Sequence, residues 1–87
     1  MSKSLVARMR ANPRGDWTIS DVEAVCRTFG LMRSPPRGGR SHYKVSHPLL
    51  RDILTIPQRR PVKPVYIRKL MRFLDAAEGA GENHEKA

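Results

Sequence analysis

Hydrophobic positions along the first third of the chain follow the spacing of helices. Residues 2–11 place apolar side chains on one helical face. Ser20 and Glu23 then match the S-x-x-E capping box, so a second helix is predicted to begin near Asp21 and to end at Gly30, a residue that accepts the left-handed conformation of a helix end. Its predicted apolar stripe consists of Val22, Val25, Cys26 and Phe29.

Residues 41–47 change to strict alternation of polar and apolar side chains, which is typical of a strand with one buried face. Tyr43 and Val45 are predicted to face a core. His42 and Lys44, with Ser46, are then predicted to lie on the opposite, open face, because successive side chains of a strand point to opposite sides of the sheet.

Two further strands are predicted around this one. Residues 31–33 can form a short first strand, and the proline- and glycine-rich residues 34–39 that follow predict a loop. Residues 53–56 are rich in β-branched side chains and stop at a proline, with Leu54 and Ile56 predicted to point inward.

The last predicted helix begins at Pro64, since proline suits the first position of a helix. Residues 78–87 have no periodic apolar pattern and are predicted to be a disordered tail, so residues 1–77 form the single expected domain. The fold class is α+β in the order α-α-β-β-β-α, with helices on one face of a small antiparallel sheet. The predicted stripe of the last helix is Ile67, Leu70, Met71, Leu74 and Ala77.

Charge narrows the choice of partner. The 87-residue chain has a net charge of +9, and the part from Arg27 to Arg72 holds twelve basic residues against one acid, Asp52, a local charge of +11. Such a field selects a polyanion, either a nucleic acid or an acidic protein. The basic residues are spread over helix, strand and loop positions, which argues against one amphipathic membrane-surface helix.

His42 lies inside this basic field, and histidine is the side chain whose ordinary pKa allows proton transfer near neutral pH. RNA cleavage without a metal needs a base, an acid and cations that stabilise the charged phosphorane. Lys44 shares the predicted face with His42, and Arg37 and Arg40 precede it in the loop. The pattern by itself fits a solvated histidine in a binding surface at least as well as a catalyst.

The remaining candidates for chemistry point to structural roles. His47 lies an odd number of positions from His42, so it is predicted on the other face and assigned to the strand end; His84 lies in the predicted tail and is given no role. Tyr43 and Tyr66 could stack on bases, but both adjoin apolar patterns that favour the core.

The sequence lacks the residues that several functional classes require. The single Cys26 excludes an intramolecular disulfide and a cysteine-pair metal site, and it is interpreted as a small buried apolar group. The sequence contains no phosphate-binding P-loop motif, no HExxH zinc motif, no long apolar span and no signal-peptide pattern. A soluble intracellular protein without a cofactor or metal is therefore expected.

Three segments in order resemble the HicA family of small mRNA interferase toxins from bacterial and archaeal type II toxin–antitoxin systems. They are Gly38-Gly39-Arg40-Ser41-His42-Tyr43-Lys44-Val45-Ser46-His47-Pro48, Leu54-Thr55-Ile56-Pro57 and Lys63-Pro64-Val65-Tyr66-Ile67-Arg68-Lys69-Leu70. The resemblance covers about residues 19–75. It implies a fold similar to the double-stranded-RNA-binding domain, a metal-independent endoribonuclease in the cytoplasm, and a HicB-type antitoxin that covers the active face.

By this resemblance His42 matches the catalytic histidine of the family, and Ser41 matches a positioning residue. The expected contacts to RNA phosphates are Arg37, Arg40, Ser41, Lys44, Arg59 and Lys63. Arg40 separates Gly39 from Ser41, where the family usually has Gly-Ser-His without a break. The sequence also leaves open a non-catalytic RNA- or DNA-binding module and a small structural or ribosome-associated protein.

Overall fold

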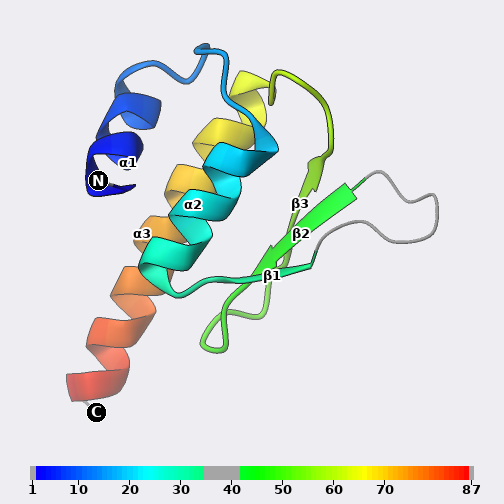
Figure 1. The fold of residues 1–87 in the computed structure, drawn as a ribbon. Helices are drawn as coiled ribbons and strands as arrows, with labels where there is room; N and C mark the ends of the chain where they lie inside the picture. The colour runs from blue at the N-terminus through cyan, green and yellow to red at the C-terminus, as the bar shows by residue number, and fades with distance from the viewer. Residues whose placement is uncertain (1, 35–41, 87) are drawn as a thin grey trace.

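The computed structural model describes residues 2–34 and 42–86, with side chains described for residues 4–34 and 42–80. Three helices and three strands follow one another in the predicted α-α-β-β-β-α order, which confirms the α+β class (Figure 1). The elements are α1 (Ser2–Ala11), α2 (Ile19–Phe29), β1 (Met32–Ser34), β2 (His42–Ser46), β3 (Leu54–Pro57) and α3 (Pro64–Lys86).

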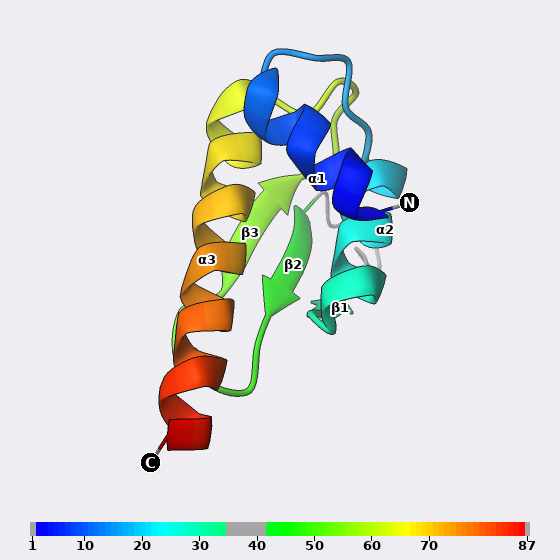
Figure 2. The ribbon, with the colours of Figure 1, turned by 90° about the vertical axis from the view of Figure 1, so that its left-hand side faces the viewer.

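The three strands form an antiparallel sheet in the order β1-β2-β3. In β2 and β3 the Cα of His42 lies opposite that of Pro57, and Lys44 lies opposite Thr55. Helices α2 and α3 cover one face, with α2 next to β1 and α3 next to β3, and α1 packs against both helices on the side away from the sheet (Figures 1 and 2). Among residues 2–34 and 42–86, no helix covers the other face of the sheet.

The core lies between the sheet and the helices, and the strand alternation predicted its sheet side correctly. Tyr43 and Val45 of β2 and Leu54 and Ile56 of β3 are buried, whereas Lys44 is exposed. The predicted stripes of the helices are also buried, except that Phe29 is half-buried. The helical members of the core are Leu5, Val6, Met9, Val22, Val25, Cys26, Ile67, Leu70, Met71, Phe73, Leu74 and Ala77.

Helix α2 begins two residues before the predicted start. Its N-cap is Thr18, whose hydroxyl oxygen accepts a hydrogen bond from the Asp21 backbone N–H at 3.3 Å. The Asp21 carboxylate in turn accepts from the Thr18 backbone N–H at 2.9 Å. The capping box predicted from Ser20 and Glu23 is therefore wrong, and an overlapping box displaces it. The end at Gly30 is confirmed, with a left-handed φ of 69°.

The first strand exists but lies one residue later than predicted. The backbone N–H groups of Gly30 and Leu31 both donate to the carbonyl oxygen of Cys26. Leu31 therefore still belongs to the closing turn of α2, and its side chain is buried at 3% exposure. Pairing with β2 begins only at Met32, opposite Ser46.

Helix α3 continues to Lys86, so the disordered tail predicted for residues 78–87 is wrong over residues 78–86. The last residue of that predicted tail, Ala87, lies outside the described residues. Residues 78–86 carry no apolar stripe and include two glycines, which disfavour a helix, but three glutamates are strong helix formers and the helix runs on from its buried first half. In Figures 1 and 2 the C-terminal part of α3 extends beyond the sheet.

One ion pair ties the first helix to the last. Arg10 donates two hydrogen bonds to the Asp75 carboxylate, at 2.7 and 3.2 Å, across 65 positions of sequence. The bond from Arg10 lowers the pKa of Asp75. Both side chains are largely exposed, so the pair contributes at most about 1 kcal/mol of stability at neutral pH, and that contribution is lost on acidification as Asp75 takes up a proton.

None of the helices within residues 2–34 and 42–86 is long and apolar enough to cross a membrane.

Candidate nucleic-acid interface

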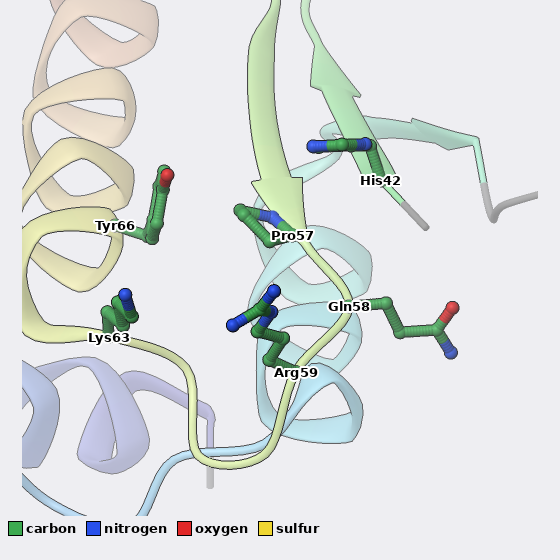
Figure 3. A pocket seen from close by; sticks show the side chains of 6 residues that line it. All are labelled: His42, Pro57, Gln58, Arg59, Lys63 and Tyr66. Carbon is green, nitrogen blue, oxygen red and sulfur yellow. The ribbon is translucent and has the colours of Figure 1, made fainter. Parts of the chain in front are cut away.

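A hollow of about 340 Å³ opens where the start of β2, the end of β3 and the start of α3 meet. Its lining residues are His42, Pro57, Gln58, Arg59, Lys63 and Tyr66 (Figure 3). Three of the residues predicted from the sequence, His42, Arg59 and Lys63, are thus brought together at one place. No acidic side chain lines this hollow among the residues that the structure describes, so it suits an anion.

His42 reaches the hollow because of its place in the sheet. It is the first residue of β2, it is exposed, and its Cα lies opposite that of Pro57. In Figure 3 its imidazole lies over Pro57 and points toward α3, with Arg59 below and Tyr66 across the opening. The predicted position of His42 on the open face of the strand is confirmed.

The loop of residues 58–63 is held in place by backbone hydrogen bonds and one buried side chain. Arg59 N–H donates to the Pro57 carbonyl at 2.9 Å. Val62 N–H donates to the Trp17 carbonyl at 2.8 Å, and the Val62 side chain is 2% exposed. Arg59 and Lys63 therefore project from a backbone that is tied to the end of β3 on one side of the exposed Arg60 and to the segment before α2 on the other.

The carbonyl of Lys63 begins helix α3. It accepts hydrogen bonds from Tyr66 N–H at 2.9 Å and from Ile67 N–H at 3.3 Å. Pro64 follows as the first helical residue, as predicted. This arrangement sets Lys63 and Tyr66 on the same first turn, where both face the hollow (Figure 3).

The two tyrosines have different surroundings. Tyr43 is 1% exposed and belongs to the core as predicted; burial raises the pKa of its hydroxyl further above its already high ordinary value. Tyr66 was also assigned to the core, but it is only half-buried and its ring lines the hollow. The Lys69 ammonium lies 5.6 Å from the centre of that ring, within cation–π range.

The other predicted phosphate contacts do not line this hollow. Lys44 is exposed on the same strand face as His42, but it lies opposite Thr55 and Ser34, toward the middle of the sheet. Arg37, Arg40 and Ser41 lie outside the described residues. Gln58, which the sequence did not single out, lines the hollow, although its side chain points away from the other labelled groups in Figure 3.

His47 has the structural role predicted for it. Its Nδ1 accepts a hydrogen bond from the Leu49 backbone N–H at 3.1 Å, which closes the turn after β2. It lines a separate small hollow with Phe29, Leu31 and Leu74 on the helical side of the sheet. His42 and His47 therefore do not form an acid–base pair.

Among residues 2–34 and 42–86, no group of three or more histidine, cysteine or carboxylate side chains is arranged to hold a metal ion. The interface within that part of the chain consists of cations, one imidazole and one phenol ring. Such a set can grip phosphate, stack on a base and move one proton at the imidazole.

Cys26 is buried in the core, and desolvation raises the pKa of its thiol from 9.0 to about 11. A raised pKa means that its contribution to stability is complete below pH 9 and is lost as pH rises toward 11. We expect the unfolding free energy of the wild type to fall by about 2–3 kcal/mol more than that of Cys26→Ala across this range. Chemical denaturation of both proteins at pH 8 and pH 11 measures this difference in unfolding free energy. If the unfolding free energy of both proteins changes equally with pH, the raised pKa of Cys26 is contradicted.

No family model matches the chain, and none of the curated proteins or solved structures compared with it matches significantly. The resemblance to HicA toxins and to the double-stranded-RNA-binding fold therefore stays a prediction from the sequence.

Proposed function

We propose that this protein is a metal-independent endoribonuclease that cleaves mRNA, acting as the toxin of a HicA-type toxin–antitoxin system. The observation that carries the proposal is the hollow in which the exposed imidazole of His42 meets Arg59, Lys63 and Tyr66 with no acidic lining residue within the described part of the chain. An imidazole surrounded by cations suits a substrate with a phosphate next to a proton that must be moved.

The reaction uses the 2′-hydroxyl of the RNA as its nucleophile. His42 accepts the proton of that hydroxyl while the 2′-oxygen bonds to phosphorus and the bond from phosphorus to the 5′-oxygen breaks. The products are a 2′,3′-cyclic phosphate and a free 5′-hydroxyl. The leaving 5′-oxygen needs a proton in turn, and Lys63 and Tyr66, which also line the hollow, are the proposed donors.

The cations hold the phosphate and stabilise the charge that builds on it. Arg59 can donate two parallel hydrogen bonds to phosphate oxygens, and Lys63 adds a point charge from the other side of the hollow. Lys44 is suited to a neighbouring phosphate further along the open sheet face. Arg37, Arg40 and Ser41 complete the proposed RNA contacts on the strength of the sequence alone.

An acidic HicB-type antitoxin is the proposed partner, in the cytoplasm of a bacterium or archaeon. Covering His42 and its basic surroundings would silence the enzyme, and a net charge of +9 favours rapid association with an acidic protein. An acidic, co-transcribed reading frame beside the gene is the first candidate for that partner.

Two matched oligonucleotides test the reaction with the purified protein. An RNA should be cut to products with 2′,3′-cyclic phosphate and 5′-hydroxyl ends in the presence of EDTA. The same oligonucleotide with 2′-deoxyribose at the cleaved nucleotide should bind but stay intact at that position, because it lacks the nucleophile. Cleavage of the 2′-deoxy position, or activity lost with EDTA, would overturn the proposed mechanism.

The second candidate is a non-catalytic nucleic-acid-binding module. It is favoured by the composition of the hollow, which holds one imidazole and no carboxylate among its described lining residues, so that a complete acid–base pair depends on Lys63 or Tyr66. RNA that is bound in a salt-dependent way but remains intact during the same assay would support this alternative.

A further inference from the structure

A second and wider groove runs between the free edge of β3 and helix α3. It encloses about 620 Å³. Residues 50–55 form one wall, and Lys69, Arg72, Phe73 and Ala76 form the other. The groove and the His42 hollow have no lining residue in common, and the Lys69 ammonium of the groove lies over the Tyr66 ring of the hollow.

Part of the groove lining is apolar, and one wall exposes a large aliphatic side chain. Ile53 is 59% exposed immediately before β3 begins. Phe73, at 9% exposure, and the exposed Ala76 lie on the opposite wall. An exposed isoleucine alone needs no explanation, but one set in a groove beside further apolar side chains suits an apolar group of a partner.

The edge of β3 supplies the second element of a docking site. The sheet order is β1-β2-β3, so within the described part of the chain β3 pairs with β2 on one side and with no strand on the other. Figure 2 shows β3 as the edge strand beside α3. An unpaired strand edge presents backbone N–H and C=O groups that an extended peptide can complete as a further strand.

The charges of the groove decide which partner fits. Arg51, Lys69 and Arg72 are exposed along it, against the single acid Asp52. If a second copy of this chain paired edge to edge, the same three cations would face one another, which opposes self-association. RNA phosphates would pair with the cations, but RNA would leave the exposed Ile53 without an apolar partner. Phe73 is too buried to stack on a base.

We propose that this groove binds an extended acidic segment of a partner protein, which adds as a strand to the free edge of β3. Alternate side chains of such a segment point to opposite faces. Its apolar side chains would pack on Ile53 and Phe73, while its carboxylates would reach Lys69 and Arg72. The binding does not depend on the ribonuclease activity proposed above.

A synthetic peptide tests the proposal on the full-length protein. The probe is a fluorescent seven-residue peptide of alternating glutamate and valine, measured by fluorescence anisotropy. Replacing Lys69 and Arg72 together with glutamate should weaken binding about tenfold or more, and Ile53→Ser should weaken it about fivefold. Arg14→Glu is the matched control, since its segment between α1 and α2 lies at the end of the molecule away from the β2–β3 turn (Figure 1), and it should change binding less than about twofold.

Backbone pairing is tested without altering the protein. The same peptide with alternate backbone nitrogens methylated keeps its charges and side chains but loses donors, and it should bind about tenfold more weakly. The proposal fails if both peptides bind alike, if the Lys69 and Arg72 variant loses affinity for single-stranded RNA but not for the peptide, or if the free protein dimerises through this edge. Circular dichroism shows whether each variant is folded. If the double glutamate variant is not folded, the neutral double variant Lys69→Gln with Arg72→Gln is used in its place.

Discussion

Replacing His42 with alanine is expected to reduce RNA cleavage by about 10²–10⁴-fold, the range that a positioned general acid or base contributes. The imidazole is exposed and makes no hydrogen bond with other described residues, so the loss should come from chemistry rather than from folding. The unfolding free energy should change by no more than about 0.5 kcal/mol. The measurements are single-turnover cleavage of a labelled RNA and thermal denaturation.

His47, the other histidine whose side chain the structure describes, provides the matched control. His47→Ala removes the acceptor for the Leu49 N–H and should cost about 0.5–1.5 kcal/mol of stability, while RNA cleavage continues at the wild-type rate. In cells, expression of the wild type should arrest growth and deplete bulk mRNA, and His42→Ala should do neither. Equal cleavage by the wild type and His42→Ala would remove His42 from the mechanism.

The sequence predicted the sheet and helix faces well because burial imposes simple periods on a chain this small. Alternation around Tyr43 and Val45 gave the buried and open sides of β2, and the stripe from Ile67 to Ala77 gave the packed face of α3. Element boundaries were less predictable. Two capping boxes overlap between residues 18 and 23, and local propensity alone does not decide which one starts α2.

The candidate site was only partly predictable, because its parts come from distant segments. Charge identified Arg59 and Lys63, and alternation identified the face of His42, but their meeting depends on the pairing of His42 with Pro57. Register between strands joined by a long connection cannot be read from either strand alone. The core role predicted for Tyr66 is wrong because the residue directly precedes Ile67, at the border of the apolar stripe, where a helix turns from the core to the surface.

The hollow and the groove are adjacent along α3, so partner binding in the groove would affect RNA binding in the hollow. Tyr66 lines the hollow and Lys69 lines the groove, one turn further along the helix, with the Lys69 ammonium 5.6 Å from the Tyr66 ring centre. Carboxylates that bind Lys69 in the groove would therefore lie close to the proposed RNA site. Such a partner would compete with RNA through charge even without touching His42.

Replacing Arg59 and Lys63 together with alanine is expected to lower kcat/KM for RNA by about 10²–10³-fold. Each charge-assisted hydrogen bond to phosphate contributes about 1.5–3 kcal/mol, and exposure of both side chains places them near the lower end of that range. The loop itself should keep its position, because its anchors are the buried Val62 side chain and the backbone bond to Trp17. Steady-state cleavage rates and RNA binding by anisotropy measure the effect.

Salt dependence separates phosphate contacts from a general loss of positive charge. Each phosphate contact that is removed should reduce the slope of log affinity against log salt by about 0.7 for single-stranded RNA. The matched control is Arg27→Ala, which removes an exposed cation from the last turn of α2, a helix that does not line the hollow. Arg59→Lys keeps the charge but loses the planar fork, so it should retain the salt slope while cleavage falls. If Arg59→Ala and Lys63→Ala leave the slope at the wild-type value, the phosphate does not lie in this hollow, and the place of His42 in an RNA site loses its structural support.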